Sequence, residues 1–255
     1  MAFFPRGFSP QKTCLLCHDL SSKAVCVPCL TDICAAKRQA ERHCPQCGGK
    51  GNGAQPCGAC QQKPPPFDLL WASAVYEPPL SGILHAFKHQ KQRALAPVLA
   101  EVMMSLPPPW LDDVRIDGVL AVPLSRKRRW QRGFNQCDEL AERLAAEYGL
   151  PLVPHDAVFR RHRPPQSTLP FDERRRNLKN SFSLAPEKQF SLPFFHFRKQ
   201  AVFQTAFDVK NRNLLLIDDV CTTNATLAEL ARMLRRSGVE RIFCWTLAKG
   251  GMQKF

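Results

Sequence analysis

The sequence predicts an α/β protein in which a parallel sheet flanked by helices follows a small cysteine-rich module. Two observations predict this. From Phe67 onward, short apolar runs that are typical of buried strands alternate with amphipathic stretches that are typical of helices. Before that point, eight of the cysteines form C-x-x-C pairs. We therefore expect a module over residues 1–63 and a larger domain over 67–255, joined by the stiff triple proline at 64–66.

The composition indicates a folded chain with a polyanionic partner. Apolar residues make up 44% of the 255 residues, which is enough for a real core. The 36 Lys and Arg residues outnumber the 22 Asp and Glu residues, and the resulting charge of +14 suits nucleic acid, a phosphorylated metabolite or an anionic membrane surface. No apolar run approaches the roughly 20 residues of a membrane span, and the N-terminus lacks the apolar stretch of a signal peptide. We therefore expect a cytoplasmic chain with reduced thiols.

The paired cysteines are candidate zinc ligands. They fall into two sets, each of which offers four thiolates and can close a tetrahedral structural Zn²⁺ site. The first set is Cys14, Cys17, Cys26 and Cys29, and the second is Cys44, Cys47, Cys57 and Cys60. Redox pairs or a single filled site are the alternatives, whereas disulfides do not suit a reducing compartment. Cys34, Cys137, Cys221 and Cys244 stand apart, and we interpret Cys221 as a packing residue.

The elements of the larger domain follow from hydrophobic period and from stop signals. Gly149 and Gly238 are typical helix stops, and Pro97 is tolerated near the start of a helix. In chain order we expect a strand at 69–76, helices at 81–91 and 95–106, a strand at 118–122, a helix at 135–148, a strand at 214–217, a helix at 225–237 and a strand at 241–248.

The junction between the strand at 214–217 and the helix at 225–237 is the main candidate site. Asp218 and Asp219 follow the apolar strand, and their carboxylates can accept hydrogen bonds from the hydroxyls of a ribose or help to hold Mg²⁺ through water. The loop ending at Thr226 then opens the helix, where unpaired backbone N–H groups favour a phosphate. An ordinary strand–turn–helix unit with a polar turn is the alternative.

Three basic clusters lie in the middle of the chain. They are 126–129 with Arg132, then Arg160 and Arg161 with Arg163, then 174–176 with Lys179. Each taken alone is typical of a solvated face. The first, however, follows the strand that ends before Pro123, so we expect it at the same sheet edge as the loop, where it suits pyrophosphate or a nucleic-acid backbone. Among these charges lie Trp130, Phe134 and Phe171, which could stack on bases but which we expect in the core.

The paired Asp followed by Thr-Thr-x-x-Thr resembles the loop of type I phosphoribosyltransferases that binds PRPP (phosphoribosyl pyrophosphate). The resemblance implies that Asp218 and Asp219 are catalytic and ribose-binding candidates. It implies phosphate contacts from the loop residues Thr222, Thr223, Asn224, Ala225 and Thr226. The family normally has Gly where this chain has Asn224. Asn tolerates positive φ, although its side chain is expected to crowd the phosphate.

Further motifs resemble the ComF family, and more closely its GntX-type members. They are Val122-Pro-Leu124, Arg132-Gly-Phe-Asn-Gln136, Gln166 with Leu169, Arg174-Arg-Arg-Asn177 with Phe182, the loop from Asp218, Lys88 and the cysteine pairs. The resemblance implies a double zinc ribbon joined to a type I phosphoribosyltransferase-like domain. It also implies a role in DNA uptake, either natural transformation or use of DNA as a nutrient. Single-stranded DNA, PRPP with Mg²⁺ and DNA-uptake proteins are the implied partners.

Two other functions stay open at this point. An active phosphoribosyltransferase would use Lys88, Arg128 and Arg132 to stabilise the leaving pyrophosphate, but no sequence feature marks its acceptor. A regulatory module would bind PRPP or a nucleotide without turnover, which Asn224 favours. The Phe-rich stretch 189–207 resembles an insertion into the family pattern and is either a packed hairpin or a stacking platform for DNA.

Overall fold

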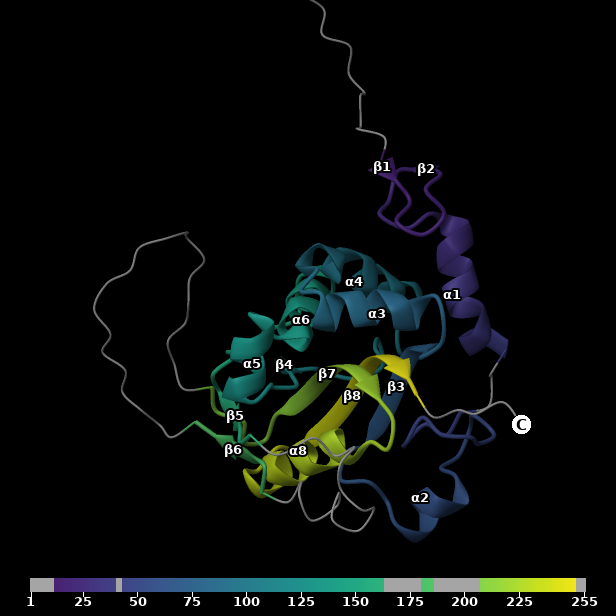
Figure 1. Ribbon diagram of the computed structural model, residues 1–255. Helices are drawn as coiled ribbons and strands as arrows, with labels where there is room; N and C mark the ends of the chain where they lie inside the picture. Colours follow the sequence, from purple (N-terminus) through teal and green to yellow (C-terminus); the bar gives the residue numbers. More distant parts are fainter. Residues whose placement is uncertain (1–11, 40–42, 163–179, 186–206, 251–255) are drawn as a thin grey trace, which may run out of the picture.

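A computed structural model of the chain describes residues 12–39, 43–162, 180–185 and 207–250 (Figure 1). The predicted parallel sheet is confirmed. It has four strands in the order β3 (Leu69–Val75), β8 (Arg241–Lys249), β7 (Asn213–Cys221) and β4 (Gly118–Ala121). Every neighbouring pair is parallel, so the carboxyl ends of all four strands meet at one edge.

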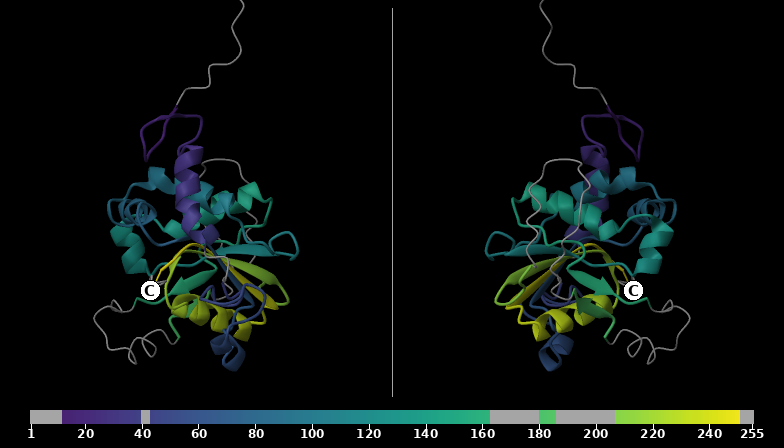
Figure 2. Two further views of the ribbon diagram at one scale, coloured as in Figure 1. Left: turned by 90° about the vertical axis from the view of Figure 1, so that its right-hand side faces the viewer. Right: turned by 90° about the vertical axis from the view of Figure 1, so that its left-hand side faces the viewer.

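Helices cover both faces of this sheet, as two side views show (Figure 2). One face carries α3 (Leu80–His89), α4 (Ala96–Ser105) and α6 (Gln136–Glu147), and the other carries α8 (Ala225–Arg236) (Figure 1). The strands are apolar on both sides because both faces are covered. No helix in the described part of the chain is both long and apolar enough to span a membrane.

The strand that carries the paired Asp residues is longer than predicted. We expected it to end at Ile217, but β7 continues to Cys221, and Asp218 still aligns with Thr246 of β8. The polar side chains suggested a loop, whereas the backbone stays in the parallel ladder. Both carboxylates are therefore held by the sheet itself rather than by a turn.

Four short elements near the sheet were not predicted. A 3₁₀ turn, η1 (Arg93–Leu95), precedes α4. The first basic cluster forms the helix α5 (Arg126–Arg132), which Ser125 caps by accepting a hydrogen bond from the backbone of Arg128. Strands β5 (Val158–Arg160) and β6 (Phe182–Leu184) pair antiparallel beside it. Several residues singled out in the sequence lie outside the described residues. They are Arg163, Gln166, Leu169, Phe171, the cluster at 174–179 and most of the Phe-rich stretch.

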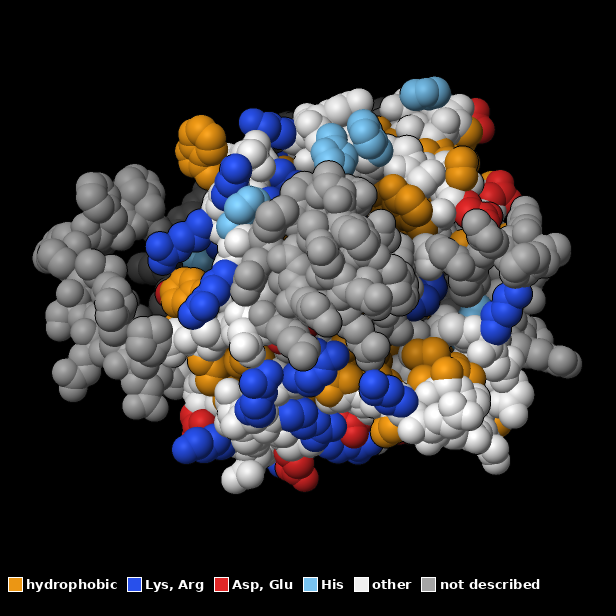
Figure 3. Space-filling view, turned by 60° about the horizontal axis from the view of Figure 1, so that its bottom comes forward, with side chains coloured by type: hydrophobic (Ala, Val, Ile, Leu, Met, Phe, Trp, Pro, Cys, Tyr) orange, Lys and Arg blue, Asp and Glu red, His pale blue; other side chains and the backbone are white. Residues whose placement is uncertain are grey.

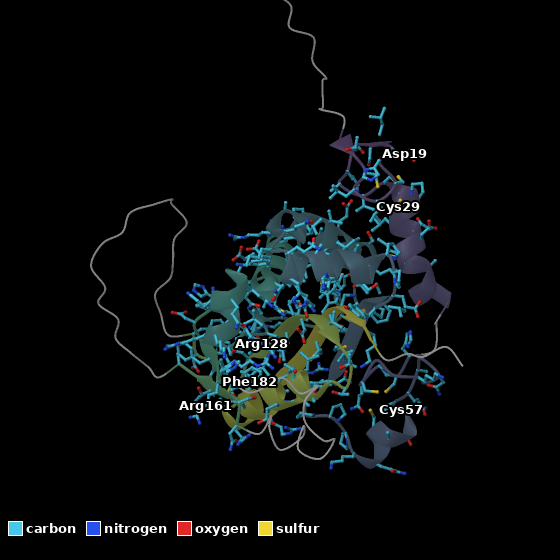
Figure 4. All side chains as sticks on the ribbon, in the orientation of Figure 1. Asp19, Cys29, Cys57, Arg128, Arg161 and Phe182 are labelled. Carbon is cyan, nitrogen blue, oxygen red and sulfur yellow. The ribbon has the colours of Figure 1, made fainter. Side chains whose placement is uncertain are left out.

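The cysteine-rich part contains β1 (Lys12–Thr13), β2 (Leu20–Ser21), α1 (Val27–Gln39) and α2 (Gly58–Gln62). Helix α1 was not predicted, and its Ile33 and Cys34 are buried in the same hydrophobic core as the sheet. It separates the two cysteine sets, which lie far apart, as the labelled Cys29 and Cys57 show (Figure 4). The second set lies against the sheet, where the backbone N–H of Leu70 donates to the carbonyl of Pro45 at 2.9 Å.

Candidate functional site at the carboxyl edge of the sheet

Asp218 and Asp219 form the centre of the site, and each is only 8% exposed. An Oδ1 atom of Asp218 accepts hydrogen bonds from the backbone of Asp219 at 2.9 Å and from the thiol of Cys137 at 3.4 Å. Asp219 accepts from the backbone of Val220 at 2.7 Å and forms an ion pair with Lys88, whose Nζ lies 3.0 Å from Oδ2. The two carboxylates are thus held in fixed orientations, and the carboxylate of Asp219 is already paired with the ammonium of Lys88.

Burial sets the protonation of these groups. Burial first, and then the charge of Asp219, raise the pKa of Asp218 from 3.8 to about 6. Burial also raises the pKa of Cys137 well above its ordinary value, so this residue is a neutral thiol that donates to Asp218. Although burial disfavours the charge of Lys88, the carboxylate of Asp219 raises its pKa. The site therefore keeps one ion pair and one carboxyl group that titrates near neutral pH.

The buried Asp218 is expected to cost stability at neutral pH. Its folded pKa lies above its ordinary value, so its contribution favours folding at low pH and is lost as the pH rises through about 6. We expect Asp218→Asn to stabilise the fold by up to about 3 kcal/mol at pH 7.5, with the gain shrinking toward pH 4. Urea unfolding at both pH values measures this, with the exposed Asp112→Asn as the control. A variant less stable than the wild type at pH 7.5 would show that Lys88 more than compensates the charge.

The loop after β7 has the features of an anion site. Thr222 and Thr223 are exposed, and Thr226 lies in the first turn of α8. Asn224 adopts the left-handed conformation, with φ 59° and ψ 5°, as expected from its tolerance of positive φ. Its side chain makes no capping hydrogen bond to the helix, so it leaves the N–H groups of the first turn for a ligand.

A basic pocket of about 360 Å³ lies beside the carboxylates. It is lined by Lys88, His89, Lys91, Arg128, Gln131 and Arg132. Three of these are predicted pyrophosphate ligands, so the structure brings Lys88, Arg128 and Arg132 together. His89, Lys91 and Gln131 were missed because nothing in their spacing connects α3 with α5. Burial and then the charge of Arg132 lower the pKa of His89, so the imidazole is neutral at pH 7.

The segment that joins α5 to α6 holds the site together. Gly133 ends α5 with φ 83° and lets the chain turn. Asn135 caps α6 by accepting from the backbone of Cys137 and donates through Nδ2 to the carbonyl of Val122 at 3.2 Å. Gln136 is buried, and its Nε2 has no hydrogen-bond partner among the described residues. The family motif contains these residues, but sequence reasoning gave them no role.

The α5 side of the site presents a basic and aromatic surface. Trp130 is 86% exposed on α5, so our expectation of core packing was wrong for this residue, whereas Phe134 is buried as expected. Two arginines lie over aromatic rings, Arg126 over Phe159 at 5.5 Å and Arg160 over Phe182 at 5.2 Å. The labelled Arg128, Arg161 and Phe182 lie on this side (Figure 4), and Figure 3 shows Lys and Arg side chains on its left, which is the side of α5, as well as a group below its centre.

Each cysteine set has the geometry of a closed zinc site. The four sulfurs of each set lie within 4.8 Å of one another. The Sγ atoms of Cys17 and Cys26 are 3.6 Å apart and those of Cys47 and Cys57 are 3.8 Å apart. Tetrahedral zinc with bonds of about 2.3 Å holds its sulfurs roughly 3.8 Å apart, whereas a disulfide is about 2 Å long. Backbone N–H groups of Cys17 and Cys26 lower the pKa of Cys14 to about 6, whereas the neighbouring Cys26 side chain and burial raise the pKa of Cys29 in the same set. Both sets are therefore compatible with structural zinc.

Cys221 is buried below the loop, and its sulfur lies 3.4 Å from the hydroxyl of Thr246. Burial raises the pKa of this thiol. Packing is therefore confirmed for this residue.

No protein-family model matches the chain. A DNA utilization protein YhgH of Salmonella typhi is 35% identical over 251 residues, covering 92% of this chain and 96% of the relative. The YhgH protein of Escherichia coli K12 is 32% identical, covering 86% and 90%. Competence protein F of Haemophilus influenzae is 30% identical, covering 85% and 90%.

Solved structures give only a loose likeness. A hypoxanthine phosphoribosyl transferase of Trypanosoma cruzi is 13% identical over 65% of this chain and 68% of its own, with a TM-score of 0.29. The hypoxanthine-guanine enzyme of L. donovani is 13% identical over 62% and 68%, with a TM-score of 0.24. Scores this low carry no argument about the site.

Proposed function

The chain belongs to the ComF family, which includes the DNA utilization protein YhgH and competence protein F, and from this premise we propose that it binds PRPP and single-stranded DNA during the uptake or use of DNA. DNA-uptake proteins are its proposed partners. A reducing cytoplasm suits this function because the ligand cysteines must stay thiolates. The proposed division is a double zinc ribbon over 1–63 and a phosphoribosyltransferase-like domain over 67–255.

One observation carries the PRPP proposal: two fixed carboxylates lie between an uncapped helix N-terminus and a basic pocket. The loop from Thr222 to Thr226 is proposed to hold the 5′-phosphate through backbone N–H groups and hydroxyls. Asp218 and Asp219 then accept hydrogen bonds from the ribose hydroxyls. This order places the pyrophosphate toward the basic pocket.

Lys88 has a double role in this proposal. Without a ligand it neutralises Asp219, at 3.0 Å. With Mg²⁺–PRPP bound, the carboxylate has a new cationic partner, and the Lys88 ammonium can turn to the pyrophosphate beside Arg128 and Arg132. Calorimetric titration with Mg²⁺–PRPP tests this part of the proposal, and the absence of binding heat at any temperature tried would contradict it.

The DNA proposal rests on the α5 surface. Trp130 stands free of the core among Arg126, Lys127 and Arg129, which are all exposed. An exposed indole amid cations is the arrangement that single-strand binders use, because bases stack on the ring while the cations follow the backbone. A core role for Trp130 would require burial, which the structure does not give it.

We expect Trp130→Leu to weaken binding of single-stranded DNA by roughly tenfold or more, because stacking contributes about 1–3 kcal/mol per base. Trp130→Phe, which keeps an aromatic face, should retain most of the affinity. Fluorescence anisotropy with labelled oligonucleotides across a salt series measures both. Lys127→Gln should instead lower the salt slope by about one. Equal affinities for the Leu and Phe variants would exclude Trp130 as a stacking residue, and a flat salt response would contradict DNA binding through this surface.

An active phosphoribosyltransferase is the second candidate, because cationic side chains surround the proposed pyrophosphate position. Incubating the protein with Mg²⁺, PRPP and a panel of nucleobases tests it through pyrophosphate release. Release above the rate of the Asp218→Asn/Asp219→Asn variant would establish turnover. Nil release from a chain that binds PRPP would leave binding as the function.

A further inference from the structure

We propose that the second cysteine set braces the phosphate loop through Asn224, so that zinc in this set controls how well the loop binds a phosphate. Asn224 is in this view a positioning residue that acts through the loop. The statement about PRPP rests on the function proposed above, whereas the coupling between zinc and loop order does not.

The brace is a closed set of contacts between distant parts of the chain. The Nδ2 of Asn224 donates to the backbone carbonyl of Cys47 at 2.8 Å. The ammonium of Lys249, at the end of β8, donates to the Oδ1 of Asn224 and also lies 3.3 Å from the Cys47 carbonyl. Lys249 is 7% exposed, so these contacts are largely shielded from water and are worth more than surface hydrogen bonds.

The chemistry of the two partners selects an amide at position 224. The carbonyl of Cys47 accepts from the side chain at position 224 and the ammonium of Lys249 donates to it, so only one orientation of the amide satisfies both contacts. Asp would place a carboxylate against the carbonyl, and Gly would leave both partners without this side chain. Asn also adopts the left-handed backbone that the loop requires. Because the amide of Asn224 is directed to Cys47, we do not expect it to crowd a phosphate bound by the loop.

The carbonyl at the other end of the brace is held by the cysteine set. Cys47 contributes a sulfur to the cluster, and the backbone N–H of Gly49 donates to that sulfur at 3.4 Å. The next residue, Gly48, has φ +66°, and a Cβ there would lie 2.6 Å from the side chain of Leu70 on β3. The turn at 44–48 is thus fixed to the sheet on one side and by its cluster on the other. The first cysteine set lies at the far end of α1 (Figure 4).

Loss of zinc from the second set should therefore release the Cys47 carbonyl and loosen the loop, whereas loss from the first set should not. Hydrogen exchange of the amides at 222–226 in the ligand-free, full-length protein measures this directly. We expect Asn224→Gly and Cys60→Ser each to speed exchange there by roughly fivefold or more, and Cys29→Ser to change it less than twofold. Metal analysis must show one zinc lost in each cysteine variant.

The decisive comparison is the double variant. If the cluster acts through Asn224, Cys60→Ser should add less than twofold in the Asn224→Gly background. Full additivity, or normal loop exchange in a Cys60→Ser chain that lacks its second zinc, would overturn the brace. If the Cys60→Ser substitution unfolds more of the chain than the second cysteine set, the Asn224→Gly variant alone tests the proposal. Coupling is reciprocal in binding free energy, so this variant must bind its second zinc roughly fivefold more weakly in competition with a chelator at equilibrium, and an unchanged zinc affinity would equally overturn the proposal.

The PRPP arm uses calorimetry with Mg²⁺–PRPP on the same chains. Asn224→Gly and Cys60→Ser should each weaken binding by roughly fivefold, and Cys29→Ser should not. Tighter binding by Asn224→Gly would show that the side chain obstructs the phosphate and would overturn the brace. If the wild type binds no PRPP while loop exchange still responds to the second set, the proposed function fails and the brace stands.

Discussion

Removing zinc is expected to unfold the cysteine-rich part of the chain while the parallel sheet stays folded. Structural zinc contributes about 10–16 kcal/mol to small modules, which is comparable to the whole stability of a typical domain. The first set has little core of its own, since Leu15, Leu20 and Val27 around it are exposed. Without the metal, nothing of similar magnitude opposes the chain entropy of this part.

Metal analysis of the purified chain should give two zinc ions per chain. Chelation should then raise hydrogen exchange across 12–35 and 43–62, whereas the amides of β7 and β8 should keep their protection. Cys244→Ala is the control, because Cys244 lies in the sheet core and this variant should still hold two ions. One ion or none in the folded, reduced protein would contradict the assignment of two sites, as would exchange that chelation leaves unchanged.

Much of the sheet and its helices could be predicted because their signals are local. The run at 214–217 is apolar throughout, the run at 241–248 is apolar apart from Arg241 and Thr246, and the helices at 135–148 and 225–237 are each followed by a glycine. Helix α1 was not predicted because we interpreted the cysteines in this stretch only as metal ligands and did not assign a helix there. Strands β5 and β6 are three residues each, and their pairing joins segments far apart in sequence, which no local pattern encodes.

The candidate site likewise has a part that the sequence predicts and a part that only the structure reveals. The loop from Asp218 to Thr226 is contiguous, so its residue types were sufficient to identify it. The partners of that loop are distant: Cys137 meets Asp218, and Asn224 meets Cys47. Neither contact can be recognised from the spacing of residues in the sequence. Trp130 was expected in the core because large aromatic residues are usually buried, and its exposure became visible only in the structure.

Loss of both carboxylates is expected to weaken PRPP binding by roughly a hundredfold or more, even though it makes the chain more positive. Each carboxylate is proposed to accept a charge-assisted hydrogen bond from the ribose, and such bonds contribute about 1.5–3 kcal/mol each. The pair should therefore account for roughly a hundredfold or more in affinity. Asp112→Asn/Asp113→Asn removes the same charge from two adjacent exposed residues and is the matched control.

Calorimetric titration of the three chains with Mg²⁺–PRPP at pH 7.5 is the most direct test of the central claim. Urea unfolding must first show that the Asp218→Asn/Asp219→Asn variant is folded and unfolds in a cooperative transition like that of the wild type. We predict that the wild type and the Asp112→Asn/Asp113→Asn control bind with similar affinity, and that Asp218→Asn/Asp219→Asn binds at least a hundredfold more weakly. Equal affinity in all three chains would contradict a PRPP site at this edge of the sheet.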